Sequence, residues 1–424
     1  MDARKFLLES ARVFRKFTLL PNRTSDTSRD SVFSVFHECP VISESLCGTR
    51  RADHIRLHVT GLPKIGVLGA GCGGHAMAAD LTLAGFEVNL FELPEFRQNI
   101  KPCLERGGIE ITGVARVGFA KPAVVTSDIG KAMDDVDIVM VTVPAFAHET
   151  FVSTFAPHLN DKQIVVFNTG YFAALRFRKT LRSRAKRVLI CENSVLPYTC
   201  RLVGPGHVHV DGKKKQTYVA ALPATGTEHA VDILRAAYPG VKCAANVLKT
   251  SLDNFNILAH AAGTLLHKGL VERADSVELP VKEAVTPSVA RVMEAINGEV
   301  SEVGKAFGVK VSSVKEMLEM WGWATKGETV YDLYQNCEAL RNYTWKWTRG
   351  SHQYLKEDLS YGLVPLASFG ELGRVPTPTI DAIIKLFSIF DGVDYRTEGV
   401  TCEKMGLAAL TSDSLQRLLN DETQ

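Results

Sequence analysis

The sequence predicts an α/β domain built on a doubly wound parallel sheet, followed by an all-helical domain. Short, continuously apolar runs alternate with helical patterns from about residue 62 to 249, as expected for strands buried on both faces of a parallel sheet. From about residue 250 to 424 the apolar residues instead recur every three or four positions, which indicates packed helices. These observations predict two domains preceded by an N-terminal extension, residues 1–61.

The N-terminal extension differs in composition from the rest of the chain. It is rich in Arg and Ser and carries only short apolar runs, so we expect it to be poorly ordered. Residues 1–17 could also form a basic amphipathic helix, which leaves a mitochondrial presequence as the alternative. Asp2 and Glu9 count against this alternative, because such peptides are poor in acidic residues.

The charge of the whole chain is nearly balanced. Its 424 residues include 49 Lys and Arg against 47 Asp and Glu, a formal net charge of +2. This excludes a strong overall field for nucleic acid or an anionic membrane, and no apolar run reaches the ~20 residues that span a bilayer. The nine cysteines form no C-x-x-C pair, which argues against a zinc ribbon or a dense disulfide framework. We therefore expect a cytoplasmic protein without a bound metal, and a homodimer is compatible with the sequence.

The α/β domain opens with a strand, a turn, a helix and a second strand. Ile65–Leu68 is a short apolar strand, Ala76–Ala84 is a strong helix former that ends at Gly85, and Val88–Phe91 is the second strand. Further strands are expected at residues 137–143, 163–167, 188–191 and 218–222. In the second domain, helices are expected at residues 252–270, 287–307 and 379–390.

The turn after the first strand, Gly69-Ala70-Gly71-Cys72-Gly73-Gly74, matches the G-x-G-x-x-G pattern of dinucleotide-binding Rossmann-type domains. Gly69 is expected to make the tight turn, Gly71 to leave room for the pyrophosphate, and Gly74 to let helix and strand approach closely. Ala70 and Gly73 complete this turn, whose backbone N–H groups would bind the phosphates at a helix N-terminus without any net charge. The pattern therefore predicts a site for NAD, with NADP as the alternative.

Glu92 follows the second strand. A carboxylate there can accept hydrogen bonds from both ribose hydroxyls of the adenosine and would repel a 2′-phosphate, which favours NAD over NADP. Arg97 lies close enough in the sequence to weaken that preference. Val143 and Pro144 follow the third strand and are expected near the nicotinamide, because ligands lie over the carboxyl ends of parallel strands.

Two loops at the same edge of the sheet carry further polar residues. His148 lies shortly after the third strand, and a histidine that opens a helix there is more often a surface or capping group than a base. The loop Asn168-Thr169-Gly170, after the next strand, is expected to shape the pocket.

His260 is the best placed of the twelve histidines, on a mostly apolar helix directly after the α/β domain. Hydride transfer to a carbonyl or an imine needs a general acid beside the reacting carbon, commonly a histidine held by a carboxylate. Asn256 lies one turn earlier on the same helix face and is a candidate substrate-binding residue. From the residues alone, the partner carboxylate could be Asp358, Glu357 or Asp253, and a buried core histidine is the alternative to a catalytic one.

Five segments of the chain stand in a distinctive order. They are residues 65–96 with the glycine motif, Asn256-x-x-x-His260, Val285-Thr286-Pro287-Ser288-Val289-Ala290-Arg291, Glu357-Asp358-x-x-Tyr361-Gly362-Leu363-Val364-Pro365-Leu366 and Pro376-Thr377-Pro378-Thr379-Ile380-Asp381. In this order they resemble the octopine/nopaline (opine) dehydrogenase family, over about residues 64–410. The resemblance implies a Rossmann domain joined to a helical domain, with catalysis in the cleft between them. It also implies reductive condensation of an amino acid with a 2-oxo acid, often pyruvate, by NADH or NADPH.

The resemblance implies roles for single residues as well. His260 would be the catalytic histidine, protonating the carbinolamine as water leaves and polarising the imine, with Asp358 as the carboxylate that holds it. Gln353 stands where family members have an arginine that helps bind a substrate carboxylate, so Gln353 and Lys356 are expected in the substrate site. The missing positive charge could come from Lys356, Arg201 or His352. His267 likewise stands where the family commonly has an asparagine.

Two other functions fit the same fold. A related two-domain dehydrogenase would reduce a 2-oxo or 3-oxo acid directly to the alcohol, usually with a lysine, for which Lys249 or Lys268 could serve. A catalytically silent NAD-binding scaffold or sensor would need no acid/base pair. The presence of both His260 and Asp358 therefore favours the enzymes.

Overall fold

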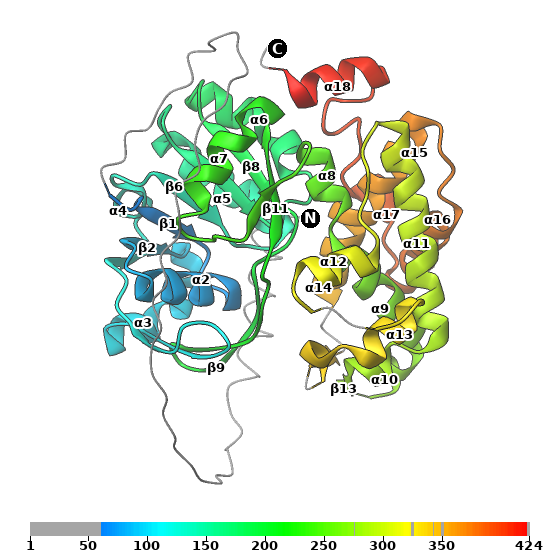
Figure 1. Ribbon diagram of the computed structural model, residues 1–424, viewed down its shortest axis with the longest axis horizontal. Coiled ribbons are helices and arrows are strands. Elements are labelled where there is room, and N and C mark those ends of the chain that lie inside the picture. Colours follow the sequence, from blue (N-terminus) through cyan, green and yellow to red (C-terminus); the bar gives the residue numbers. More distant parts are fainter. Residues whose placement is uncertain (1–60, 275, 324–325, 342, 349–351, 422–424) are drawn as a thin grey trace, which may run out of the picture.

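The computed structural model describes residues 61–274, 276–323, 326–341, 343–348 and 352–421. Figure 1 shows a sheet domain, coloured blue to green, beside a helical domain, coloured green to red, with α8 (Val247–Leu252) between them. The expected α/β domain followed by a helical domain is confirmed. The proposed boundary at residues 249–250 falls inside α8 and stays a prediction. Residues 1–60, almost all of the expected extension, lie outside the described residues.

The sheet domain is built on eight strands in the order β12-β11-β8-β7-β6-β1-β2-β5. They are β1 (Ile65–Leu68), β2 (Val88–Phe91), β5 (Val124–Thr126), β6 (Ile138–Val141), β7 (Ile164–Asn168), β8 (Leu189–Asn193), β11 (Thr217–Leu222) and β12 (Val241–Cys243). β1 pairs in parallel with both β2 and β6, so the winding direction reverses at β1, where doubly wound sheets bind their ligands.

Helices cover both faces of this sheet because successive strand residues point to opposite sides. Val139 and Val141 enter one hydrophobic core, whereas Ile138 and Met140 enter the other. The helices against the first core are α4 (Ile129–Met133), α5 (His148–Phe155) and α6 (Ala173–Arg184). Those against the second are α2 (Cys72–Leu83), α3 (Lys101–Arg106) and α7 (Thr227–Leu234).

The expected parallel arrangement is wrong at one edge of the sheet, because β11 runs antiparallel to β8, and β12 pairs in parallel with β11 and shares its direction. The reason lies in the connection between β8 and β11, which contains β9 (Tyr198–Gly204) and β10 (His207–Lys213) and no crossover helix. Parallel neighbours need such a crossover, whereas a hairpin excursion returns the chain in the opposite direction. β9 and β10 join β3 (Ile109–Gly113) and β4 (Gly118–Ala120) in a second, four-stranded sheet that packs on α2.

The helical domain contains the three expected helices within a few residues of their expected ends. They are α9 (Phe255–Arg273), α11 (Pro287–Ala306) and α16 (Pro378–Asp391). The other helices of this domain, within the described residues, are α10 (Val281–Ala284), α12 (Val314–Met320), α13 (Val330–Asn336), the 3₁₀ turn η6 (Glu338–Leu340), α14 (His352–Glu357), the π-helical turn η7 (Asp358–Leu363), α15 (Val364–Gly373), α17 (Tyr395–Glu398) and α18 (Ser412–Asn420). The expectation of helices alone is wrong at one place, because β13 (Ser276–Pro280) pairs with β14 (Thr344–Thr348).

The two domains share a hydrophobic core. The core on the α5–α6 face of the sheet continues through Leu252 into α9, α11 and α15. In Figure 1 the C-terminal helix α18 lies above both domains, and it contacts the sheet-domain turn at Ala224–Gly226. The sheet domain and the helical domain are therefore packed as one structure around their common interface.

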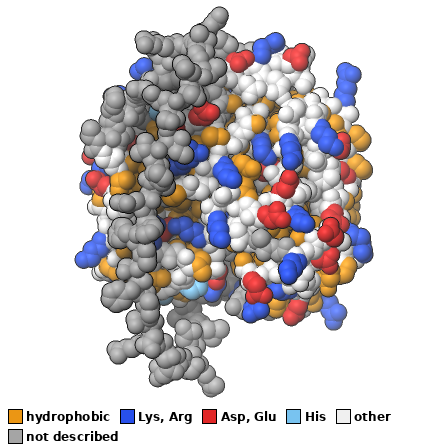
Figure 2. Space-filling model, viewed as in Figure 1, with side chains coloured by type: hydrophobic (Ala, Val, Ile, Leu, Met, Phe, Trp, Pro, Cys, Tyr) orange, Lys and Arg blue, Asp and Glu red, His pale blue; other side chains and the backbone are white. Residues whose placement is uncertain are grey.

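The visible surface carries charges of both signs. Figure 2 shows Lys and Arg side chains interspersed with Asp and Glu over this face, in keeping with the small net charge of +2. Among the described helices, none combines the length and apolar character needed to cross a membrane.

Candidate active site

The glycine turn has the shape of a phosphate cradle. Gly69 has φ +105°, and a Cβ there would lie 2.2 Å from Cγ1 of Val143. A Cβ on Gly74 would lie 1.7 Å from the carbonyl oxygen of Gly69, so helix and strand approach as closely as expected. Gly71 is different, because a Cβ there would meet nothing within 4 Å. The turn is therefore tightly packed underneath and open at Gly71, the N-cap of α2, and this shape fits a dinucleotide.

Glu92 lies directly behind this turn. Its Oε2 accepts hydrogen bonds from the backbone N–H of Ala70 and from Nδ2 of Asn99, both at 3.0 Å, and Oε1 accepts from the N–H of Leu93. Burial raises the pKa of Glu92 although these bonds lower it. The carboxylate thus sits beside the position expected for the adenosine ribose and also fixes the glycine turn. Arg97 lies in the 3₁₀ turn that follows and is exposed.

The loop after β6 joins the glycine turn to the helical domain. Oγ1 of Thr142 donates to the carbonyl oxygens of Leu68 and Gly69, and Val143 packs against Gly69. Further along the same loop, the N–H of Ala145 donates to Oε1 of Glu357 at 2.6 Å. Val143 and Pro144 therefore lie between the glycine turn and the helical domain, at the edge of the sheet where a nicotinamide is expected.

The structure brings His260 and Asp358 together. Nδ1 of His260 lies 2.8 Å from Oδ2 of Asp358, although 98 residues separate them. The His260 side chain keeps 33% of its surface exposed whereas that of Asp358 keeps 1%, so the imidazole can be reached while its partner is shielded. Tyr171 donates its hydroxyl to the other carboxylate oxygen, Oδ1, at 2.7 Å. The three residues form a chain of hydrogen bonds that ends at the imidazole.

The charges around the imidazole favour its protonated form. Burial lowers the pKa of His260, but the negative charge and hydrogen bond of Asp358, with a contribution from Glu357, outweigh burial and raise the pKa above its usual value. Glu357 lies next to this pair, and burial together with the charge of Asp358 raises its pKa to about 8. A histidine with a raised pKa keeps its proton to higher pH, which suits it to act as a general acid.

The sequence alone did not identify Tyr171 as a residue of the site. It follows the predicted loop Asn168-Thr169-Gly170 directly, and only that loop was expected near the pocket. Tyr171 and Phe172 both adopt positive φ angles of 49° and 60° before α6 begins. Such angles are uncommon for large side chains and mark functional positions, but they are visible only in the structure.

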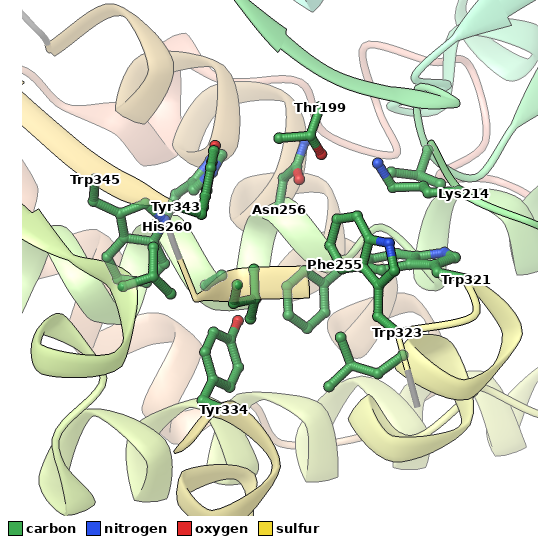
Figure 3. A pocket seen from close by; sticks show the side chains of 15 residues that line it. Thr199, Lys214, Phe255, Asn256, His260, Trp321, Trp323, Tyr334, Tyr343 and Trp345 are labelled. Atoms are coloured by element: carbon green, nitrogen blue, oxygen red, sulfur yellow. The ribbon is translucent and has the colours of Figure 1, made fainter. Parts of the chain in front are cut away.

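His260 and Asn256 open onto a pocket of about 520 Å³, counting its mouth. Figure 3 shows that the walls are largely aromatic, with side chains from α9, α13 and the segment around Trp321. Phe255 contacts the Trp321 ring edge to face, with centroids 5.1 Å apart, and stacks on Tyr334. The pocket lies beside the imidazole, and its largely apolar walls with a few polar groups are typical of a small-molecule site.

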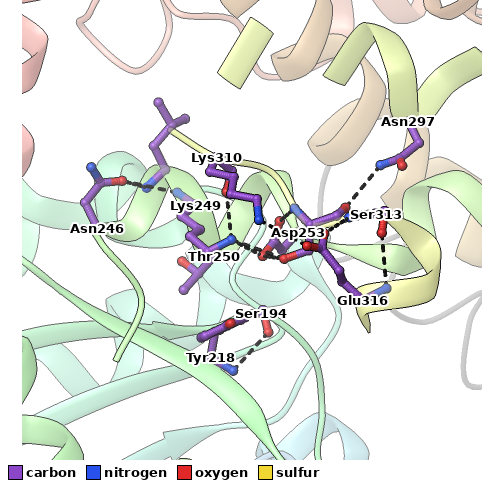
Figure 4. Close-up of polar contacts among 12 residues, drawn as sticks. Ser194, Tyr218, Asn246, Lys249, Thr250, Asp253, Asn297, Lys310, Ser313 and Glu316 are labelled. Carbon is purple, nitrogen blue, oxygen red and sulfur yellow. Dashed lines mark hydrogen bonds and ion pairs between the residues drawn. The ribbon is translucent and has the colours of Figure 1, made fainter. Parts of the chain in front are cut away.

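The alternative partners and bases have other contacts. Asp253 accepts hydrogen bonds from the N–H and hydroxyl of Ser312 and pairs with Lys249 at 2.7 Å, in the network shown in Figure 4. This network fixes the chain between α8 and α9, and neither residue lines the pocket. Lys268 lies within 4 Å of carboxylate oxygens of Glu272 and Asp391. The described geometry therefore favours Asp358 as the partner of His260.

Other expected residues are placed as follows. The interpretation of His148 as a surface or capping group is wrong: it opens α5 but is fully buried against Phe167 and Phe177, because the helix starts beneath the sheet edge. His267 stacks on Trp347 and hydrogen-bonds the carbonyl oxygen of Gly263. Gln353 lies in α14, Lys356 is partly buried in the same helix, and Arg201 pairs with Asp211 on the surface. The side chains of Gln353 and His352 lie outside the described residues.

A metal centre is not part of this arrangement as far as the chain is described. Among the described residues, no three His, Cys, Asp or Glu side chains come together in a way that could hold a metal ion. The fold and site instead define a two-domain, NAD(P)-dependent dehydrogenase with a nucleotide-binding sheet, a helical domain and a histidine–aspartate pair whose histidine lines a pocket formed by both domains.

Comparisons with known proteins identify the family. Residues 243–390 match the model of the NAD/NADP octopine/nopaline dehydrogenase α-helical domain, and residues 65–224 match that of ketopantoate reductase PanE/ApbA. The opine dehydrogenase of Arthrobacter sp. (strain 1C) is 36% identical over 82% of this chain and 97% of its own. The octopine dehydrogenase of Pecten maximus is 25% identical over 67% of this chain and 77% of its own.

A solved structure of octopine dehydrogenase, in complex with NADH and agmatine, superposes with a TM-score of 0.68 and covers 84% of this chain and 98% of its own. At 20% identity that likeness supports the fold alone. The chain belongs to the octopine/nopaline (opine) dehydrogenase family, as the sequence motifs indicated. It is an NAD(P)H-dependent oxidoreductase that acts on CH–NH bonds, through reductive condensation of an amino acid with a 2-oxo acid.

Proposed function

We propose that His260 is the general acid of this condensation, that Asp358 holds and stabilises its charged form, and that a small 2-oxo acid such as pyruvate is the carbonyl substrate. The observation that carries the proposal is the hydrogen-bonded chain Tyr171–Asp358–His260, which ends in a reachable imidazole at the aromatic pocket. A buried aspartate hydrogen-bonded to Nδ1 fixes the ring so that Nε2 faces the reactants.

The proton moves as follows. The amine of the amino acid adds to the carbonyl carbon of the 2-oxo acid and forms a carbinolamine. Nε2 of His260 donates its proton to the hydroxyl, the C–O bond breaks and water leaves, so an iminium ion forms and the imidazole becomes neutral. When bound, the nicotinamide would supply the hydride that reduces this carbon. His260 then takes a proton from solvent, which its raised pKa favours.

The residues expected to bind the cofactor fit this scheme. Backbone N–H groups at the start of α2, those of Gly71, Gly73 and Gly74, would bind the pyrophosphate. Gly69 and Ala70, whose N–H groups donate to Phe91 and Glu92, would shape the turn. Glu92 would accept from the adenosine ribose, and Val143 with Pro144 would border the nicotinamide. Asn256, Gln353 and Lys356 remain the proposed substrate contacts, of which Asn256 lines the pocket beside His260.

The test is NADH oxidation with pyruvate, with and without a panel of amino acids. NADH consumption that requires both substrates supports the proposal. His260→Ala should then abolish turnover while NADH affinity stays nearly unchanged, because the glycine turn lies on a different domain. Unchanged turnover of this variant would show that His260 is not the general acid.

Direct reduction of an oxo acid is the second candidate, favoured by the match of residues 65–224 to the ketopantoate reductase model. This reduction usually relies on a lysine beside the carbonyl oxygen, which must receive a proton. The two lysines considered for that role, Lys249 and Lys268, lie among carboxylates away from the pocket. Turnover with the oxo acid alone would support this candidate. Tight NADH binding without turnover would support a scaffold or sensor.

We also propose a cytoplasmic location and leave the homodimer as a prediction. The seven cysteines of the described residues are all free thiols, which fits a reducing compartment. Fractionation of cells and sedimentation of the purified protein would test the two proposals separately.

A further inference from the structure

Lys214 brings a positive charge to the aromatic pocket that contains His260. It follows β10 directly, is partly buried and lines the pocket with Thr199 and Asn256. Its Nζ lies 5.1 Å from the ring centroid of Trp321 and 5.2 Å from that of Trp323. Figure 3 shows the ammonium directed toward Thr199 and Asn256, above the two indoles.

The backbone of Lys214 is held from two sides. Its N–H donates to the carbonyl oxygen of Pro197 at 2.9 Å, within the sheet domain. The next N–H, of Lys215, donates to the carbonyl oxygen of Trp321 at 3.0 Å, within the helical domain. The ammonium is therefore presented to the pocket from a fixed segment at the domain interface.

The ammonium of Lys214 has no counter-ion among the described residues. No described carboxylate or carbonyl oxygen accepts a hydrogen bond from it, whereas the neighbouring Lys213 pairs with Asp80 at 2.7 Å. Burial lowers the pKa of Lys214 to about 8, so most of it is charged at neutral pH. Nε1 of Trp321, on the same wall, is also buried without an acceptor. A desolvated charge that has aromatic faces but no anion beside it is costly to bury, so this wall favours an anion from outside the protein.

The two arginines near the site, in contrast, already interact with carboxylates of the protein. Arg176 lies between the rings of Phe177 and Tyr361, and three carboxylates act on its charge: Glu149, Glu192 and Glu357. Arg201 pairs with Asp211. Of the described residues that line the pocket, Lys214 alone is a lysine or arginine, and none is an aspartate or glutamate.

We propose that Lys214 binds the α-carboxylate of the amino-acid substrate and that the aromatic walls receive an apolar or aromatic side chain of that substrate. Lys214 then supplies the charge that family members take from the arginine replaced here by Gln353. A cationic side chain such as that of arginine would find no described carboxylate in this pocket, whereas an apolar side chain would bury its surface against Phe255, Trp321 and Tyr334. The proposal rests on the proposed function, because it assumes that the pocket beside His260 receives the amino acid.

Kinetics of Lys214→Met give the first test, with Lys215→Met as the matched control because Lys215 is adjacent and exposed. With saturating NADH and pyruvate, the KM for phenylalanine should rise at least about thirtyfold in Lys214→Met, or about 2 kcal/mol at 1.4 kcal/mol per factor of ten. The KM for pyruvate and the affinity for NADH should not change, and Lys215→Met should behave as the wild type. Lys214→Arg, which keeps the charge, should retain more affinity for phenylalanine than Lys214→Met. An unchanged KM for phenylalanine, or a rise confined to pyruvate, would overturn the assignment.

Calorimetry gives a second test that needs no turnover. In the NADH-saturated full-length protein, 3-phenylpropanoate should bind the wild type at least about thirtyfold more tightly than Lys214→Met. The neutral 3-phenylpropanamide should bind both equally. Equal affinity of the carboxylate for both proteins would refute the role of Lys214, whether or not the condensation itself is observed. In the wild type, a higher kcat/KM for arginine than for phenylalanine would refute the proposal that the aromatic walls receive an apolar side chain of the substrate.

Discussion

Tyr171→Phe should weaken catalysis without disturbing the fold. The substitution removes one hydroxyl that donates to Oδ1 of Asp358 at 2.7 Å, and phenylalanine keeps the ring that packs at this buried position. A hydrogen bond to a charged group contributes about 1.5–3 kcal/mol, so kcat/KM should fall by up to about 10- to 150-fold. The loss should stay well below that of His260→Ala, because Asp358 remains hydrogen-bonded to His260.

The pH profile separates a positioning role of Tyr171 from a merely structural one. Without the hydroxyl, the Asp358 carboxylate holds more of its negative charge on the oxygens that face His260. The pKa of His260, already raised, should therefore rise further, by about half a unit or more. The assay is kcat/KM for NADH oxidation with pyruvate and an amino acid, measured from pH 5.5 to 9.

Tyr395→Phe is the matched control, because the Tyr395 hydroxyl donates to Asp391 at the same 2.7 Å, away from the pocket. It should leave both kcat/KM and its pH profile unchanged. If Tyr171→Phe also leaves the profile unmoved, the hydrogen-bonded chain does not tune His260 and the reasoning is refuted.

Three further predictions concern the cofactor turn and the residue beside the dyad. Gly71→Ala should leave the free energy of unfolding unchanged, since its Cβ meets no protein atom, but should weaken NADH binding about tenfold, measured by fluorescence titration. Glu92→Ala should lower the ratio of kcat/KM with NADH to kcat/KM with NADPH. An unchanged ratio would exclude the contact between Glu92 and the adenosine ribose. Glu357→Gln should change how stability depends on pH. The pKa of Glu357 is about 8 when folded against 4.5 when unfolded, so this carboxyl destabilises the fold increasingly from about pH 4.5 to 8. In urea unfolding, the free energy of unfolding of the variant should increase relative to that of the wild type as the pH rises through this window, by at most ~1.4 kcal/mol per pH unit. If the free energies of both proteins depend on pH in the same way, the raised pKa of Glu357 is contradicted.

Features encoded in neighbouring residues were predictable from the sequence. The strand Ile65–Leu68, the glycine turn and the start of α11 at Pro287 depend on local patterns, and the structure places them as expected. The second sheet was not predictable in this way. β10 pairs with β3 nearly a hundred residues earlier, and its alternating polar residues do not form the continuous apolar run of a doubly buried strand.

The candidate site was predictable only in part, because its contacts join distant segments. From the residues alone, three carboxylates were possible partners of His260, and the structure places Asp358 within hydrogen-bond distance of it. Tyr171 could not be found because its partner lies 187 residues away. Lys214 lies within the run Lys213-Lys214-Lys215, a pattern typical of a solvated surface, and only the fold shows that its middle member faces the pocket.

The hydrogen bonds between the domains have a consequence for protein engineering. Tyr171 and the Ala145 N–H belong to the sheet domain, whereas Asp358 and Glu357, which they contact, belong to the helical domain. A chimera that takes its nucleotide-binding half from one relative and its helical half from another would have to preserve both pairs. Exchange of the first half to alter coenzyme preference would therefore also change the acid/base chemistry, unless these two contacts were transferred with it.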